Sequence, residues 1–189
     1  MTRGKLFVIS GPSGVGKGSI CKRILEADSN MRFSVSMTTR APREGEVEGV
    51  DYFFVSKEQF EKLLCEGQLL EHNQFVENYY GTPRQSVMDW LDEGCDVLLE
   101  IDYHGAFQVR ESYPAAVLIF IAPPSIEALR ERIMGRGSET EEQLEGRLKQ
   151  AMDDMAHADE YDYMVVNDDI RTAVWQVQQI IRIEKGKEV

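Results

Sequence analysis

The sequence predicts one α/β domain built on a mainly parallel sheet that is flanked by helices. Short apolar runs, which are typical of buried strands, alternate along the chain with segments whose apolar residues recur at helical spacing. The length of 189 residues suits a single domain, and 42% hydrophobic with 29% charged residues is an ordinary composition for a folded protein. The longest apolar run, 115–122, is much shorter than the ~20 residues of a membrane helix. We therefore expect a cytoplasmic protein without a membrane partner.

In the first half of the chain, strands are predicted at residues 5–10, 33–36, 51–55 and 69–75. Helices are predicted at residues 17–27, 57–65 and 82–93. The second of these helices opens with a capping box that begins at Ser56 and is closed by Gly67. The third is expected to have Thr82 as its N-cap and Pro83 as its first residue.

In the second half, strands are predicted at residues 95–102, 115–122 and 163–166, and helices at 125–135, 138–157, 168–185 and between the first two strands. Residues 37–50 and 130–150 lack core periodicity, so we expect functional loops or small mobile insertions there. Cys21, Cys65 and Cys95 are an odd number without C-x-x-C spacing, which predicts neither a disulfide framework nor a zinc site. We expect all three to be buried small hydrophobic residues.

The charge is distributed unevenly along the chain. The formal net charge is −12, which argues against a nucleic acid partner. Residues 1–43 nevertheless hold eight Lys and Arg against two Asp and Glu, a net charge of +6, whereas residues 44–189 have a net charge of −18. The basic segment indicates a local anion site, and chance clustering is the alternative that composition leaves open.

Residues 11–17, Gly-Pro-Ser-Gly-Val-Gly-Lys, fit the G-x-x-x-x-G-K pattern of a phosphate-binding loop. They lie between a predicted strand and a predicted helix, as this pattern requires. The glycines let backbone N–H groups converge on phosphate oxygens, and the helix N-terminus adds partial positive charge. Lys17 can then reach the β- and γ-phosphates. The pattern predicts a nucleotide site without specifying the reaction.

The residue after this lysine is Gly18, where a serine or threonine usually holds Mg²⁺. Either Ser19 takes that role, or the metal is held through water and carboxylates. Glu100 and Asp102 end an apolar strand at the expected ligand-binding edge of the sheet, where they can order water around Mg²⁺. Asp102 also begins a D-x-x-G pattern found in GTPases, but no N-K-x-D pattern follows it, which disfavours a regulatory GTPase.

The segment 38–54, Thr-Thr-Arg-Ala-Pro-Arg-Glu-Gly-Glu-Val-Glu-Gly-Val-Asp-Tyr-Phe-Phe, offers two arginines and a tyrosine to a second phosphate group. This segment resembles the signature of guanylate kinases. The resemblance continues through Asn-Tyr-Tyr-Gly-Thr at 78–82, Leu-Leu-Glu-Ile-Asp at 98–102, Arg-Gly-Ser-Glu-Thr-Glu at 136–141 and Val-Val-Asn-Asp at 165–168. It covers essentially the whole chain, and the combination is highly specific.

The resemblance implies a P-loop NTPase-type parallel sheet flanked by helices, with a GMP-binding insertion and a small helical lid. The implied parts are a core at 1–34, 91–124 and 158–189, a GMP-binding part at 35–90 and a lid at 125–157.

The resemblance also assigns site residues. ATP is expected to contact Gly11, Pro12, Ser13, Gly14, Val15, Gly16, Lys17, Gly18, Ser19, Arg132, Asn167 and Asp168. GMP is expected to contact Ser36, Arg40, Arg43, Tyr52, Glu71, Tyr80, Thr82 and Asp102. The expected catalytic residues are Lys17, Arg43, Arg136 and Arg147, and Mg²⁺ is expected near Ser19, Glu100 and Asp102, through water.

The implied reaction is ATP + GMP ⇌ ADP + GDP, by in-line transfer with Mg²⁺. The GMP phosphate is itself an anionic nucleophile, so no general base is required, and dGMP is a further candidate acceptor. Glu71 can accept both the N1–H and the 2-amino group of guanine, whereas adenine offers it a lone pair. A binding module without catalysis and a kinase for another nucleoside monophosphate are the alternatives, and the oligomeric state stays open.

Overall fold

The computed structural model describes residues 2–75, 77–135 and 141–187. Its central sheet has five strands in the order β2-β7-β1-β8-β9. These are β1 Leu6–Ser10, β2 Met31–Phe33, β7 Asp96–Glu100, β8 Val117–Ala122 and β9 Tyr163–Val166. The pairs β2–β7, β1–β8 and β8–β9 are parallel, and β1 and β8 are buried at every residue. The α/β class and the parallel sheet predicted from the sequence are confirmed.

The chain divides into two compact units. Unit 1 holds the N-terminal residues through Leu6 together with Asn30–Leu99 and His104–Ala116. Unit 2 holds Phe7–Ser29, Glu100–Tyr103 and the chain from Val117 onward.

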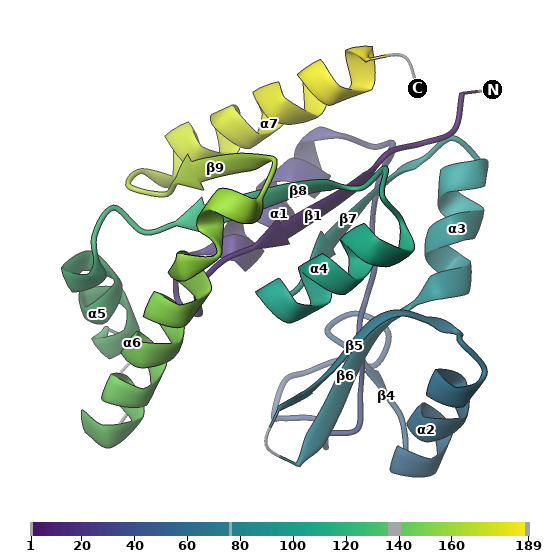
Figure 1. Ribbon diagram of the computed structural model, residues 1–189, viewed down its shortest axis with the longest axis horizontal. Helices are drawn as coiled ribbons and strands as arrows, with labels where there is room; N and C mark the ends of the chain where they lie inside the picture. The colour runs from purple at the N-terminus through teal and green to yellow at the C-terminus, as the bar shows by residue number, and fades with distance from the viewer. Residues whose placement is uncertain (1, 76, 136–140, 188–189) are drawn as a thin grey trace. The chain divides into compact units, whose positions relative to one another are not determined.

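In unit 2, helix α1 (Lys17–Ala27) follows β1, and α7 (Ile170–Gly186) packs against α1 and β9. Buried apolar residues recur along α7 at helical spacing, which explains why this segment is a helix with one face in the core. Helices α5 (Ile126–Met134) and α6 (Glu141–Ala156) lie side by side (Figure 1). A short 3₁₀ turn, Ala158–Glu160, follows α6.

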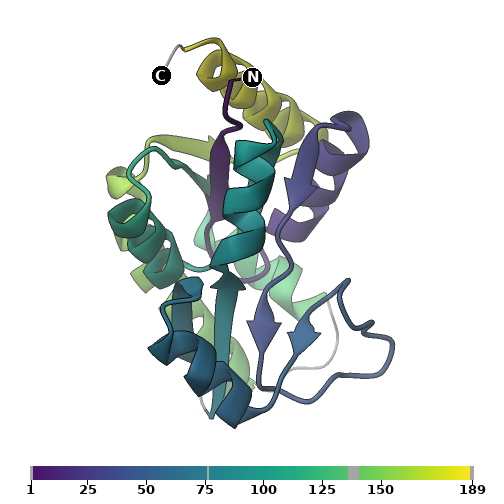
Figure 2. The same cartoon turned by 90° about the vertical axis from the view of Figure 1, so that its right-hand side faces the viewer.

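Unit 1 contains a second sheet of four strands in the order β4-β3-β6-β5. These are β3 Met37–Thr38, β4 Phe53–Phe54, β5 Leu69–Phe75 and β6 Asn78–Pro83. Strand β6 is antiparallel to both β5 and β3, and β3 is parallel to β4. Figure 2 shows the loop 39–52 leaving β3 and returning to β4. The helices of this unit are α2 (Lys57–Cys65) and α3 (Arg84–Asp92), with α4 (Tyr103–Ser112) beginning at its boundary.

Most predicted helices agree with the structure, and the capping box at Ser56 is present. The prediction that Thr82 and Pro83 begin a helix is wrong. Both residues belong to β6, because the backbone here pairs with β5, and α3 begins only at Arg84. The single strand predicted at 33–36 is also wrong, since β2 ends at Phe33 and β3 begins at Met37.

Other predictions need smaller corrections. Within 130–150 the described residues are mostly helical, in α5 and α6, whereas the proposed cap at Ser138 lies outside the described residues. The last helix begins at Ile170 rather than residue 168, with Asp169 as its N-cap. The prediction of buried cysteines holds for Cys21 but not for the exposed Cys65 or the half-buried Cys95. None of the helices in the described part of the chain is long and apolar enough to cross a membrane.

Candidate active site

The loop between β1 and α1 has the backbone that the phosphate-binding pattern requires. Gly11, Gly14 and Gly16 have φ values of 140°, 85° and 100°, which L side chains rarely adopt. A Cβ at Gly11 would lie 2.2 Å from the carbonyl oxygen of Ile121, so side chains are also excluded by space. Gly16 is the N-cap of α1 and has no side chain to cap the helix, which leaves the first N–H groups available for an anion.

The side chain of Lys17 lies inside this loop. Its Nζ donates to the carbonyl oxygen of Gly11 at 2.6 Å and to that of Pro12 at 3.1 Å. Burial lowers the pKa of Lys17, while the nearby carboxylates of Glu100, Asp154 and Asp102 raise it in part. The loop therefore holds a desolvated cation at the helix N-terminus, where a phosphate would replace the carbonyl oxygens as its partner.

Three of the predicted ATP residues form a network with the loop. The buried side chain of Asn167 donates from Nδ2 to the carbonyl oxygen of Val15 at 2.7 Å. Arg132 donates from Nη1 to the carbonyl oxygen of Asn167 at 2.8 Å, and from Nη2 to that of Asp168 at 3.3 Å. The bond from Asn167 to Val15 joins residues 152 positions apart. Arg132 of α5 bonds to the two residues that precede Asp169, the N-cap of α7.

The candidate metal ligands provide oxygen donors beside the loop. A Cβ at Gly18 would lie 3.4 Å from Oε2 of Glu100, so this carboxylate faces the first turn of α1. Burial raises the pKa of Glu100, against the opposing effect of Lys17. Ser19 and Asp102 are exposed. Among the described residues no group of three His, Cys, Asp or Glu can enclose a metal. This donor set fits Mg²⁺, which is commonly bound by one or two carboxylates, water and substrate phosphates.

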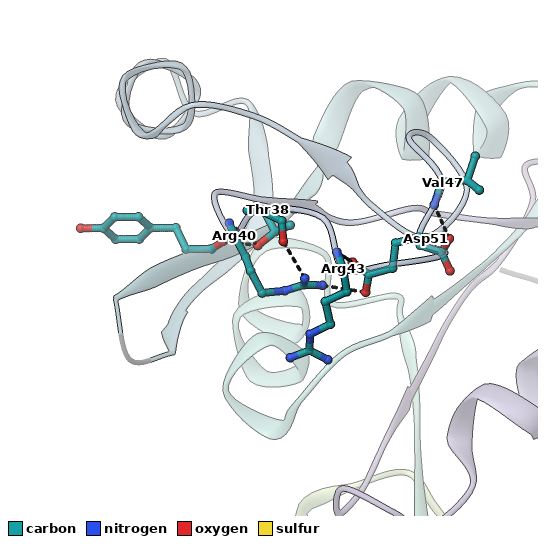
Figure 3. A network of polar contacts seen from close by, with 8 residues as sticks. Thr38, Arg40, Arg43, Val47 and Asp51 are labelled. Carbon is teal, nitrogen blue, oxygen red and sulfur yellow. Dashed lines mark hydrogen bonds and ion pairs between the residues drawn. The ribbon is translucent and has the colours of Figure 1, made fainter. Parts of the chain in front are cut away.

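The residues predicted to bind the GMP phosphate lie in unit 1, on the loop 39–52 and on β6. Arg40 lies with its guanidinium 5.4 Å from the ring centroid of Tyr52, and Tyr52 and Tyr80 have ring centroids 6.0 Å apart. The hydrogen bond to Glu46 raises the pKa of Arg40, and a hydrogen bond that Arg40 donates to the Tyr80 oxygen adds to this effect. Figure 3 shows Arg43 on the same loop with its guanidinium directed away from the ion pair that Arg40 makes.

That ion pair involves Glu46, which sequence reasoning did not identify. Nη2 of Arg40 lies 2.8 Å from Oε1 of Glu46, and the backbone N–H of Arg43 donates to Oε2 at 2.8 Å. The two side chains are only 14% and 19% exposed. Arg40 lowers the pKa of the Glu46 carboxyl. The only sign of this pair in the sequence is that Glu46 follows Arg43 by three residues in the same loop.

The predicted base-contacting residues Glu71 and Thr82 are brought together across β5 and β6. Both are buried, and Oγ1 of Thr82 donates to Oε1 of Glu71 at 2.5 Å. Ser36 precedes β3, and its carbonyl oxygen accepts from the N–H of Phe53 at 2.9 Å. Asp102, which was also predicted to contact GMP, belongs to unit 2.

Two predicted catalytic arginines belong to the expected lid. Arg147 lies on α6 and is half-buried, whereas Arg136 lies outside the described residues. On the same helix, the buried Asp154 is a further group that sequence reasoning missed. It accepts from Gln150 at 3.0 Å and is among the carboxylates that raise the pKa of Lys17.

Comparisons with known proteins match nearly the whole chain to one family. A family model described as guanylate kinase matches residues 3–184. The chain is 51% identical over 185 residues to a guanylate kinase of Oceanobacillus iheyensis, covering 98% of this chain and 90% of that protein. It is 48% identical over the same length to a guanylate kinase of Clostridioides difficile, with the same coverage.

A solved structure is similar as well. The crystal structure of guanylate kinase from Anaplasma phagocytophilum matches with a TM-score of 0.82 at 40% identity, covering 98% of this chain and 88% of that one. Together with the phosphate-binding loop and the paired groups around Arg40 and Glu71, these matches show that the chain belongs to the guanylate kinase family.

Proposed function

We propose that the residues of unit 2 around the phosphate-binding loop hold ATP and that those of unit 1 around Arg40 and Glu71 hold GMP. The enzyme catalyses ATP-dependent phosphorylation of GMP to GDP, as its family does. The observation that supports this assignment of residues is that most of the predicted ligands fall into two sets. One surrounds the phosphate-binding loop of unit 2, with Lys17 and Asn167 bonded to loop carbonyl oxygens, and the other lies in unit 1, with the pairs Arg40–Glu46 and Thr82–Glu71.

On the ATP side, Lys17 and the N–H groups of the loop would bind the β- and γ-phosphates. The Asn167 side chain keeps the loop in shape through Val15, and Arg132 and Asp168 border the same region. Lys17 would exchange its two neutral carbonyl partners for phosphate oxygens. The buried ammonium group would then be paired with a negatively charged group, which makes the stronger hydrogen bond. The cytoplasm, where both nucleotides occur, is the proposed place of action.

Mg²⁺ would be held through water by Ser19, Glu100 and Asp102, next to the phosphates. When bound, the ion neutralises charge on the transferred phosphoryl group. The position of Glu100 beside Gly18 supports this role, because the absence of a side chain at Gly18 leaves the carboxylate room to face the nucleotide.

On the GMP side, Arg40, Arg43, Tyr52 and Tyr80 would bind the phosphate. The grouping of Arg40 with the two tyrosines supports this, because a guanidinium and two hydroxyls present donors to a phosphate. The phosphate of GMP attacks as an anion, so the reaction needs no side chain to remove a proton. Catalysis then rests on positioning and on charge neutralisation by Lys17, Arg43, Arg136 and Arg147.

We assign contact with the guanine base to Ser36, Glu71 and Thr82, with Asp102 near the base. The carboxylate of Glu71 would accept the N1–H and the 2-amino group of guanine. Adenine would leave this buried carboxylate facing a ring nitrogen lone pair, which is the kind of mismatch that discriminates by orders of magnitude.

Water must be kept from the γ-phosphate, or the enzyme would hydrolyse ATP. We assign this to closure of the GMP-binding part, 35–90, and of the lid, 125–157, on the core formed by 1–34, 91–124 and 158–189. Closure with both substrates bound would also bring the lid arginines to the transferring group.

Glu71→Gln tests the base assignment. The amide keeps one acceptor but places a donor where guanine also presents a donor. The loss of one charge-assisted hydrogen bond, about 1.5–3 kcal/mol, lowers kcat/KM for GMP roughly 10- to 150-fold and reduces the preference for GMP over AMP. Glu61→Gln is the matched control, because it makes the same chemical change at an exposed residue of α2. An unchanged GMP/AMP ratio in Glu71→Gln would remove Glu71 from base recognition.

A further inference from the structure

Strand β5, which carries Glu71, lies at the edge of the four-stranded sheet. An edge strand presents unpaired backbone groups, and here side chains of α4 pair with them. Oε1 of Gln108 accepts from the N–H of His72 at 3.0 Å, and Nε2 of Gln108 donates to the carbonyl oxygen of the same residue at 2.8 Å. Oγ of Ser112 donates to the carbonyl oxygen of Leu70 at 3.2 Å. Residues on both sides of Glu71 are therefore tied to α4.

The pairing of β5 with β6 is irregular at the same place. Leu69 pairs with Pro83, whereas Glu71 pairs with Thr82, so Leu70 is an extra residue in β5. Such bulges change the direction in which the following side chain points, and they leave a backbone group without a partner in the ladder. The hydroxyl of Ser112 supplies a partner for Leu70. The direction of the Glu71 carboxylate thus depends on an irregularity that α4 stabilises.

Leu69, Leu70 and Glu71 of this edge strand are buried, yet a hollow that is open to solvent lies beside them. The hollow has a volume of about 400 Å³ and is lined in part by Leu64, Leu70, Gln108, Glu111 and Ser112. Where this hollow opens to solvent, β5 lacks the contacts on all sides that hold a strand in a packed interior. The hydrogen bonds from Gln108 and Ser112 join β5 to α4 beside this hollow.

We propose that Gln108 is a positioning residue for guanine selectivity, with Ser112 in a supporting role. This inference rests on the proposed role of Glu71 and deepens it. Without Gln108, water entering the hollow can bond to both backbone groups of His72, so the strand persists. Water does not fix the distance between β5 and α4, however, and the Glu71 carboxylate then loses the fixed orientation with which it meets two adjacent donors.

The test compares GMP with inosine monophosphate, which keeps the N1–H of guanine but lacks the 2-amino group. Gln108→Met removes both hydrogen bonds at similar side-chain length. We expect KM for GMP to rise, kcat at saturation to change little, and the GMP/inosine monophosphate ratio of kcat/KM to fall about tenfold. Gln85→Met is the matched control, because Gln85 bonds only to Asp89 among the described contacts, on an exposed face of α3. Its ratio should equal that of the wild type.

Two companion variants separate this inference from the role of Glu71. If Glu71→Gln leaves the ratio unchanged, the base assignment itself fails. If Glu71→Gln lowers the ratio and Gln108→Met does not, the assignment stands and the positioning role of Gln108 is overturned. Gln108→Met added to Glu71→Gln should lower the ratio by less than twofold more. A full tenfold effect in that background would show that Gln108 acts elsewhere.

A variant that removes less of the structure covers the case in which Gln108→Met does not fold. Ser112→Ala removes a hydroxyl that lies 3.2 Å from the carbonyl oxygen of Leu70 and 3.4 Å from that of Val109, and it should lower the ratio in the same direction by a smaller factor. A wild-type ratio in a folded Ser112→Ala protein, as judged by thermal unfolding, would contradict the supporting role of Ser112.

Discussion

Replacing Gly81 with alanine should disturb the GMP-binding group and the stability of unit 1 together. Gly81 lies in β6 and pairs with His72. A Cβ there would lie 3.0 Å from the carbonyl oxygen of Glu71, 3.1 Å from Cζ of Phe60 and 3.2 Å from Cδ1 of Leu69. The φ of Gly81 is not in the left-handed region, so the cost is steric rather than conformational. Overpacking of this kind costs about 1–3 kcal/mol.

For a chain of this length, each kcal/mol lowers Tm by about 2–4 °C, so Gly81→Ala should unfold roughly 2–12 °C below the wild type. KM for GMP should rise because the methyl group pushes the backbone of Glu71 away. Thermal unfolding followed by circular dichroism and steady-state kinetics measure the two effects. Gly146→Ala is the control, since a Cβ on this α6 residue meets nothing within 4 Å and alanine favours a helix by about 1 kcal/mol. Its Tm should rise, and a Gly81→Ala protein with wild-type Tm and KM would refute the reasoning.

Three other substitutions or conditions test single contacts. Arg40→Lys loses the planar guanidinium fork and should raise KM for GMP about tenfold with a smaller effect on KM for ATP; equal effects on both would argue against a GMP-phosphate role. Because burial lowers the pKa of Lys17, kcat/KM for ATP should fall as the pH rises through a value below 10.5, where the lysine loses the charge that binds phosphate, and a profile flat to pH 10.5 would contradict this. Asn167→Ala leaves the carbonyl oxygen of Val15 without its buried partner and should cost about 1–3 kcal/mol in unfolding free energy while raising KM for ATP more than for GMP. A larger rise in KM for GMP than for ATP would contradict the role of the Asn167–Val15 hydrogen bond in shaping the ATP site.

The sequence was sufficient to predict those parts of the fold that are formed by residues adjacent in the chain. The buried strand β1, the glycines of the following loop and the start of α1 at Lys17 are contiguous, so their pattern identifies them directly. The same holds for the capping box at Ser56. Candidate site residues were found where they belong to contiguous motifs, as with Arg40 and Arg43.

Features that arise from tertiary pairing could not be predicted in this way. Strand β6 contains Gly81 and Pro83, which are poor strand residues, and it forms because β3 and β5 supply hydrogen-bonding partners on either side. The contact of Gln108 with His72 joins residues 36 positions apart, and nothing in the helical pattern of α4 distinguishes this glutamine from an exposed one. The tether from Asn167 to Val15 spans 152 positions.

The central claim is that this enzyme uses ATP to phosphorylate GMP with guanine selectivity. The most direct measurement is ADP release by the purified protein with ATP and Mg²⁺, in parallel reactions with GMP, AMP, CMP, UMP and no acceptor. The proposed ATP and GMP sites predict rapid ADP release with GMP and ADP release near background in the other four reactions. ADP release without an acceptor would contradict the exclusion of water, and no release from folded protein that still binds GMP would contradict catalysis itself.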